Sequence, residues 1–113
     1  MNCIFCKIAS GSIPSRKVAD SEELYAFEDV NPQAPTHILI IPKRHIESTL
    51  SLKQEDAGLI GRITILANEI AASRGLDKTG FRLLTNTGRD GGQSVFHLHY
   101  HLLGGRLMEW PPG

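Results

Sequence analysis

Three histidines stand at alternating positions in one short apolar segment near the end of the sequence. His97, His99 and His101 are three of the five histidines in the chain, and single residues separate them. Because side chains in a β-strand point alternately to its two faces, this spacing predicts a strand over residues 95–103 with all three imidazoles on one face. A helix would scatter the same rings around its axis. The pattern therefore predicts a strand that carries a functional face.

Closely spaced imidazoles have a definite chemistry. Neighbouring rings on such a face are roughly 6.6–6.8 Å apart along the strand, which disfavours simultaneous protonation and leaves at least one ring neutral near pH 7. A neutral imidazole nitrogen is a nucleophile, whereas a protonated neighbour is a general acid or an anion clamp. Two other interpretations stay open here: three surface histidines on a polar sheet face, or a three-histidine metal site.

Length and charge narrow the class of protein. The 113 residues (12.4 kDa) are enough for one domain, residues 1–113, with its own core. Twelve basic residues balance twelve acidic ones, so we expect no binding to nucleic acid or to a membrane through a basic surface. The longest apolar run covers only residues 38–41, and the N-terminus lacks the apolar core of a signal peptide. We therefore expect a cytoplasmic protein in which Cys3 and Cys6 are reduced and form a metal or redox motif rather than a disulfide.

The remaining pattern predicts an α+β fold in which an antiparallel sheet of about five strands packs against one long helix. A short N-terminal helix is expected over residues 3–9, ending near Gly11. The strands are expected at residues 16–20, 23–28, 37–41, 81–86 and 95–103.

The long helix is expected in the middle of the chain, between Ser51 and Gly75. Ser51 and Gln54 have the spacing of a capping box, and Gly75 stands where a residue in the left-handed conformation would end the helix. Apolar residues between them recur at steps of three and four and form one stripe. They are Leu59, Ile60, Ile63, Leu66, Ala67, Ile70 and Ala71.

A glycine-rich loop directly precedes the three histidines. Its residues 91–94 have the sequence GGQS. Glycines let a ligand approach the backbone closely, and successive amide groups with a serine hydroxyl can hold phosphate oxygens. The same sequence is also typical of an ordinary hairpin turn. Beside three histidines it favours a phosphate cradle next to a nucleophile.

These residues together resemble a known family. Residues 97–103 (HLHYHLL) are similar to the histidine triad (HIT) signature, in which three histidines alternate with apolar residues. The resemblance extends over essentially the whole chain and is to the Hint branch of the superfamily. It includes Phe5 and the segments 13–14 (IP), 27–29 (FED), 32–37 (PQAPTH), 41–43 (IPK), 91–94, 104–106 (GGR) and 110–113 (WPPG).

The resemblance implies a fold and an activity. Members of this branch are homodimers whose sheets join into one, and they hydrolyse purine nucleoside phosphoramidates such as AMP joined to an amine. By this analogy His99 attacks the α-phosphorus and forms a nucleotidyl-histidine intermediate. His101 contacts the phosphate and helps proton transfer to the leaving group, which the chemistry requires because an amine leaves poorly unless it is protonated. His37 orients the site, and His97 completes the catalytic set.

The resemblance also assigns binding residues. Asn86, Ser94 and the Gly92 backbone match phosphate contacts, and Asp29 matches a carboxylate that binds both ribose hydroxyls. From the residues alone, the better explanation of Asp29 is a turn residue before an Asn-Pro pair. Trp110 matches a residue near the partner subunit's site, although a tryptophan there can also close the edge of the monomer's own core. Apolar residues that match the purine pocket, or that are simply core, are Phe5, Phe27, Val30 and Leu39.

A structural zinc ion is expected from one part of the family. In those relatives Cys3, Cys6, His45 and His97 correspond to a Cys₂His₂ ligand set, which suits tetrahedral zinc. With all four positions filled by protein, catalysis itself needs no cofactor. The alternative is that zinc is absent, both cysteines are packing thiols, and His97 only supports His99. Glu28 and Glu109 depart from the histidines of some eukaryotic relatives, so base-edge contacts and leaving-group selectivity can differ.

Other functions stay open. A relative that cleaves dinucleoside polyphosphates is the nearest rival. A nucleotidyltransferase of the superfamily is disfavoured, because such enzymes carry glutamine where this chain has His101. A nucleotide sensor or scaffold with incidental hydrolysis would use the same pocket, and a redox or metal-storage protein would need solvent-reactive cysteines. The leaving group, the preference between adenine and guanine, and the pathway are not determined by the sequence.

Overall fold

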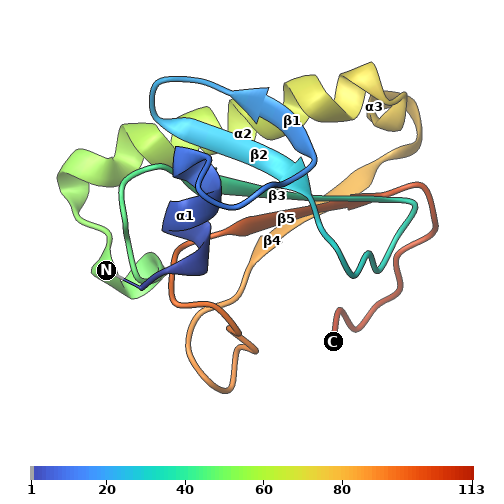
Figure 1. Cartoon of the computed structure of the whole chain (residues 1–113). Helices are drawn as coiled ribbons and strands as arrows, with labels where there is room; N and C mark the ends of the chain where they lie inside the picture. The colour runs from blue at the N-terminus through green and yellow to red at the C-terminus, as the bar shows by residue number, and fades with distance from the viewer. Residues whose placement is uncertain (1) are drawn as a thin grey trace.

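The computed structural model describes residues 2–113 and contains one five-stranded antiparallel sheet. The strand order is β1-β2-β3-β5-β4, so the third strand lies at the centre (Figure 1). This confirms the α+β fold with about five strands. The strands are β1 (Lys17–Asp20), β2 (Leu24–Glu28), β3 (Thr36–Pro42), β4 (Phe81–Thr85) and β5 (Tyr100–Gly104).

Apolar clusters lie on both faces of the sheet, which is why every residue of β3 is buried. On one face, the alternate residues Ile38 and Ile40 pack with the apolar stripe of α2 (Ala57–Ser73). On the other, Leu39 and Ile41 pack with α1 (Ile4–Ser10). Figure 1 shows α2 behind the sheet and α1 in front of it. A strand covered on both faces has a continuous apolar run rather than an alternating one.

The predicted helices differ from the observed ones mainly at their starts. α1 ends at Gly11 with φ of +84°, as predicted. The predicted capping box at Ser51 is wrong: α2 begins only at Ala57. Two short 3₁₀ turns precede it, Thr49–Ser51 and Gln54–Asp56. The Asp56 carboxylate takes over the expected role of capping, because its Oδ2 accepts a hydrogen bond of 2.9 Å from the backbone N–H of Lys53.

The C-terminal end of α2 follows the prediction and then adds an element. Gly75 has φ of +75° and ends the helix in the left-handed conformation. A further helical turn, α3 (Leu76–Thr79), follows directly and was not predicted. None of the helices within residues 2–113 is long and apolar enough to cross a bilayer.

The last strand begins later than predicted. β5 starts at Tyr100, so residues 95–99 lie outside it. The physical reason is that the chain before Tyr100 pairs elsewhere: the Leu98 N–H donates to the Ile46 carbonyl at 2.6 Å. The alternation of faces nevertheless holds. Leu98 and Leu102 are buried in the cluster with α2, whereas His99 and His101 have ring centroids 5.1 Å apart.

Candidate active site

The main chain of residue 97 fixes the orientation of His99. The Nδ1 atom of His99 lies 2.8 Å from the carbonyl oxygen of His97. Because a carbonyl only accepts, Nδ1 carries the proton, and the singly protonated ring keeps its lone pair on Nε2. The His99 residue is only 4% exposed, and the Thr85 hydroxyl holds the His99 carbonyl at 2.7 Å. His99 therefore presents its lone pair on Nε2, the arrangement that a nucleophilic histidine needs.

A second chain of hydrogen bonds fixes the protons of His37 and His101. The Gln33 backbone N–H donates to His37 Nδ1 at 3.0 Å, so the proton of neutral His37 sits on Nε2. That nitrogen lies 2.9 Å from His101 Nδ1 and donates to it, which leaves the His101 proton on Nε2. Within residues 2–113 this buried Nε2 has no hydrogen-bond partner. His101 thus offers one unpaired donor beside His99.

Burial keeps these two rings neutral. Desolvation, followed by the nearby His99 and His37, lowers the pKa of His101 to about 4. Desolvation also lowers the pKa of His37, against an opposing effect of the Asp29 carboxylate. Both directions agree with the hydrogen bonds, because a doubly protonated His37 would place a proton against the Gln33 N–H.

The low pKa of His101 predicts that the protein loses stability in mild acid. Between about pH 6.5, the ordinary histidine pKa, and about pH 4, the unfolded chain binds a proton that the folded one does not. The free energy of unfolding therefore falls as pH drops through this interval. His101→Asn removes the titrating group and retains an acceptor for His37, so its urea midpoint should depend less on pH. Both proteins keep the group of Cys3, Cys6, His45 and His97 described below, so parallel pH profiles would contradict the assignment.

Asp29 is a turn residue, one of the two roles that the sequence left open, and it also lies beside the histidine cluster. Its Oδ1 accepts from the Asn31 N–H at 2.8 Å, which makes it a turn residue. Its Oδ2 lies 3.3 Å from His37 Nε2, which also brings it to the histidine cluster. Asp29 lines a hollow of about 590 Å³, with Phe27 and Val30 also on its wall.

The four residues predicted to line the purine pocket lie in different environments from one another. The Phe5 ring stands edge-on to Phe27 at 5.6 Å and to His99 at 5.1 Å, so it lies between the wall of the hollow and His99. Leu39 is buried in the same apolar cluster. Val30 is 99% exposed and contributes only to the rim.

The glycine-rich loop is closed by a side chain that the sequence did not single out. Gln93 is buried, its Oε1 accepts from the Gly88 N–H at 2.9 Å, and its amide donates to the Glu47 carbonyl at 2.8 Å. Gly92 has φ of +82°. The two predicted phosphate-binding side chains lie in different surroundings. Ser94 is exposed and lines a hollow with Cys3. Asn86 follows β4 and lies opposite His99 if the β4–β5 register is continued.

Gly91 is required by space in this loop, which gives a prediction. A Cβ at Gly91 would overlap the Thr87 carbonyl oxygen, so we expect Gly91→Ala to destabilise the protein by about 1–3 kcal/mol. The control is Gly61→Ala in α2, where nothing lies within 4 Å of the new Cβ and a gain of about 0.5–1 kcal/mol is expected. Urea unfolding measures both, and equal effects would contradict the clash.

The four predicted zinc ligands converge, and their spacing fits a tetrahedral ion. His97 Nδ1 lies 3.4 Å from Cys3 Sγ and 3.5 Å from Cys6 Sγ. His45 Nδ1 lies 3.5 Å from Cys6 Sγ and 3.2 Å from His97 Nδ1. Tetrahedral zinc with its usual bond lengths separates sulfur from nitrogen by about 3.6 Å and two nitrogens by about 3.4 Å. The cluster therefore has the size and donor set of a Cys₂His₂ site.

Hydrogen bonding around the ligands also fits a metal. The Nε2 of His97 donates to the Pro42 carbonyl at 2.8 Å, which leaves Nδ1 unprotonated and turned to the cluster, the arrangement that metal-bound histidines use. Burial lowers the pKa of His97 and raises that of Cys6, the latter also through hydrogen bonding and charge from Cys3.

A second group of close donors does not fit a metal. Asp29, His37 and His101 also place one donor atom each within 4.8 Å of one another. However, His37 Nδ1 accepts from a backbone N–H, so its Nε2 bears a proton and has no lone pair for a metal. This group is better suited to holding protons in place than to coordinating a metal.

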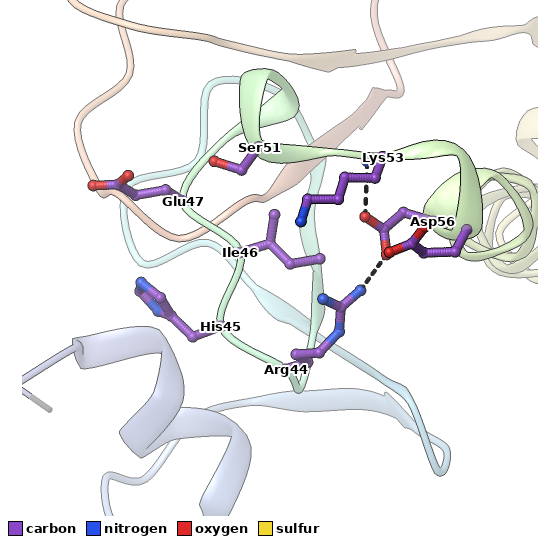
Figure 2. Close-up of a pocket in the computed structure, with 8 residues that line it drawn as sticks. Arg44, His45, Ile46, Glu47, Ser51, Lys53 and Asp56 are labelled. Atoms are coloured by element: carbon purple, nitrogen blue, oxygen red, sulfur yellow. Dashed lines mark hydrogen bonds and ion pairs between the residues drawn. The ribbon is translucent and has the colours of Figure 1, made fainter.

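Figure 2 shows how the segment that carries His45 is held. Asp56 is buried and bonds both the Lys53 backbone and the Arg44 guanidinium, and these two contacts hold the pKa of its carboxyl below the usual range. Arg44, Lys53 and Asp56 line a surface hollow of about 600 Å³. The His45 ring lies on the side of the segment that faces α1, away from Asp56.

The structure corrects or extends other assignments. Trp110 is 83% exposed, so the alternative that it closes the monomer's own core is wrong. Glu28 pairs with Arg74 at 2.6 Å.

Two backbone groups, the carbonyl of Pro42 and the N–H of Gln33, set the tautomers of two histidines, His97 and His37. As backbone groups, they carry no residue-specific signal in the sequence.

Comparison with known proteins places this geometry in a family. Residues 2–109 match the family described as "Scavenger mRNA decapping enzyme C-term binding". An uncharacterized HIT-like protein of Synechocystis sp. is 46% identical over 110 residues, which cover 97% of this chain and 96% of that protein. The protein HitA of Neisseria gonorrhoeae is 48% identical over 103 residues, covering 91% and 95%.

Solved structures agree. A HIT family hydrolase from Legionella pneumophila superposes with a TM-score of 0.98 at 50% identity, covering 99% of this chain and 100% of the other. A histidine triad nucleotide-binding protein from Candida albicans has a TM-score of 0.81 at 34% identity, covering 89% and 73%. The alternating histidines, the five-stranded sheet beside them and these relatives together show that the chain belongs to the histidine triad (HIT) superfamily.

Proposed function

We propose that this protein is a nucleotide-binding hydrolase that cleaves the P–N bond of purine nucleoside phosphoramidates of the AMP–amine type. Family membership and the likeness to a HIT family hydrolase and a nucleotide-binding triad protein support the coarser part, a nucleotide-binding hydrolase. The observation that carries the proposal is the pairing of His99, whose lone pair is on Nε2, with His101, whose unpaired proton is on Nε2.

The proposed reaction has two displacements. His99 Nε2 attacks the α-phosphorus, a P–N bond forms to the ring, and the P–N bond to the amine breaks. The amine leaves with a proton taken from a first water, which becomes hydroxide. A second water then attacks the nucleotidyl-histidine and loses its proton to this hydroxide, which releases the nucleoside monophosphate and restores His99. Asp29 is proposed to bind the ribose, and the 590 Å³ hollow with Phe27 on its wall is proposed to hold the base.

His101 is assigned a narrower role than the sequence suggested. To become an imidazolium it would need a proton on Nδ1, where it already accepts from His37. Because His37 is fixed in turn by the Gln33 N–H, we propose that His101 stays neutral and donates a hydrogen bond from Nε2 to the reacting phosphoryl group. Such a preorganised donor stabilises charge that develops in the transition state.

We propose that Cys3, Cys6, His45 and His97 hold a structural zinc ion. Zinc bound by four protein ligands stabilises the fold and, with no open position, contributes no chemistry at the phosphate. The proposed catalytic step at His99 is assigned no cofactor.

A homodimer with one continuous sheet is also proposed. β1 and β4 are the two edges of the sheet. β1 carries Lys17 and Asp20 and an irregular register, features that protect an edge from pairing. β4 has a regular register with β5 and half-buried residues throughout. Pairing through β4 would leave the exposed Trp110 available to the partner. A sedimentation mass of one chain would contradict this.

The activity is tested with matched substrates. Purified protein is mixed with adenosine or guanosine phosphoramidates that carry a fluorescent amine, and with diadenosine tetraphosphate. We expect kcat/KM for the P–N substrates to exceed that for the polyphosphate at least 100-fold. The reverse order would favour the polyphosphate hydrolase. AMP binding without turnover of any substrate would favour a sensor.

A further inference from the structure

One residue, His97, belongs to both the cysteine cluster and the nucleophile's support. Its side chain is fully buried, with Nδ1 turned to Cys3, Cys6 and His45. Its main-chain carbonyl accepts the Nδ1 proton of His99 at 2.8 Å. Any movement of the His97 ring that turns its peptide therefore changes the bond that keeps the His99 lone pair on Nε2.

Without a cation only weak pairwise contacts hold the cluster. Pro42 holds the proton of His97 on Nε2, so Nδ1 presents a lone pair. His45 Nδ1 is 3.2 Å away, and two sulfur atoms complete the group. Each thiol proton can bridge one sulfur–nitrogen pair, and a thiol is a weak donor, whereas one cation binds all four atoms at once. The His97 ring is thus held more firmly when a metal is bound than when it is not.

Helix α1 makes a second connection between the cluster and the active site. Phe5 lies between the two cysteines in sequence, and Cys3 caps the helix by accepting the Cys6 N–H at 3.4 Å. The Phe5 ring stands edge-on to His97 at 6.0 Å and to His99 at 5.1 Å. Figure 1 shows α1 in front of the sheet, where its apolar residues pack against β2 and β3.

The segment that carries His45 makes a third connection. Its next residue, Ile46, accepts the Leu98 N–H at 2.6 Å, directly between His97 and His99. The Glu47 carbonyl in turn accepts from Gln93 in the glycine-rich loop. The cluster is therefore joined to the nucleophile through the chain segments on either side of it.

We propose that His97 is a positioning residue that couples metal binding in the Cys3–Cys6–His45 cluster to the tautomer of His99. Metal in the cluster fixes the His97 main chain, so His99 keeps its proton on Nδ1 and its attacking lone pair on Nε2. Loss of the metal frees both His97 and Phe5, and His99 then exchanges between its two neutral tautomers. Only the naming of His99 as nucleophile rests on the proposed function.

The cluster is open to exchange with solvent. Cys3 and His45 line a hollow of about 520 Å³ together with Ser94, and both cysteines are only partly buried. An ion can therefore enter and leave without unfolding the sheet. The activity of this protein would then depend on metal availability although no metal touches the phosphate.

The test follows the ring nitrogens of His99 by NMR in the full chain labelled with ¹⁵N-histidine. With zinc bound we expect one proton-bearing Nδ1 and one unprotonated Nε2. Chelator should merge these signals toward an average and lower kcat at least 10-fold, and added zinc should restore both. His45→Ala should behave as the stripped protein at limiting zinc. The control is Glu47→Gln, whose exposed side chain makes no bond within residues 2–113 and which should resemble wild type.

Substitution of the larger Cd²⁺ keeps the cluster filled and the chain folded, so it tests the coupling even if the stripped protein unfolds. We expect the His99 Nδ1 signal to shift and that of His37, which has no bond to the cluster, to stay. A His99 signal that is unchanged by removal of zinc and by Cd²⁺, or a chain that takes up no metal, would overturn the proposal. A tautomer that responds to metal in a protein with no phosphoramidase activity would instead overturn only the proposed function.

Discussion

His99→Asn is expected to lower kcat for an adenosine phosphoramidate by at least about 10³-fold, because it removes the nucleophilic nitrogen. Asparagine is chosen because its amide N–H can still donate to the His97 carbonyl, as Nδ1 does now. The fold and the hollow beside Asp29 should therefore be kept. The measurement is amine release by the variant and wild type at saturating substrate.

Two controls accompany this variant. AMP affinity should stay within a few-fold of wild type, since the asparagine side chain would still fill the site. The intact mass of protein quenched in alkali should show an added nucleotidyl group in wild type only. A His99→Asn protein that keeps a tenth of the turnover, or that carries the same adduct, would assign the nucleophile to another residue.

Removal of the proposed zinc ion is expected to have the largest effect on stability. A ligand present at 1,000 times its Kd adds about 4 kcal/mol to the free energy of unfolding, which for a domain of this size is roughly 10–20 °C in Tm. Chelator should therefore lower the melting temperature of zinc-loaded protein by about that amount. Part of this loss would come from α1, which Cys3 caps and both cysteines anchor.

The matched control is the Cys3→Ser/Cys6→Ser double variant. It should melt near the temperature of the stripped wild type and should not respond to chelator, and metal analysis should find about one equivalent per chain in wild type alone. A double variant with full metal content, or a wild type whose melting ignores chelator, would contradict the assigned ligand set.

Local patterns predicted the elements of the fold well. Four strands lie within a residue or two of their predicted bounds, and Gly11 and Gly75 end their helices as expected. The errors arose where distant contacts replaced local ones. Residues 95–99 leave the sheet because Leu98 bonds to Ile46, 52 positions earlier, and the start of α2 is set by Asp56 with Arg44 rather than by Ser51.

The candidate active site shows more clearly that local sequence patterns do not predict contacts between distant residues. The residue types at positions 97, 99 and 101 already indicate the chemistry, and the family resemblance indicates the four metal ligands. The proton positions do not follow from residue types. They depend on the carbonyls of Pro42 and His97 and on the N–H of Gln33. Every residue except proline has that backbone donor and acceptor, so only the folded structure shows which histidine they face.

The covalent pathway through His99 is tested most directly by stereochemistry at phosphorus. A P-chiral adenosine phosphoramidothioate is hydrolysed in ¹⁸O-labelled water, and the configuration of the product is compared with that of the substrate. Each in-line displacement inverts the phosphorus centre, so attack by His99 Nε2 followed by attack of water predicts overall retention. Inversion would show a single direct attack by water and would contradict the nucleotidyl-histidine intermediate.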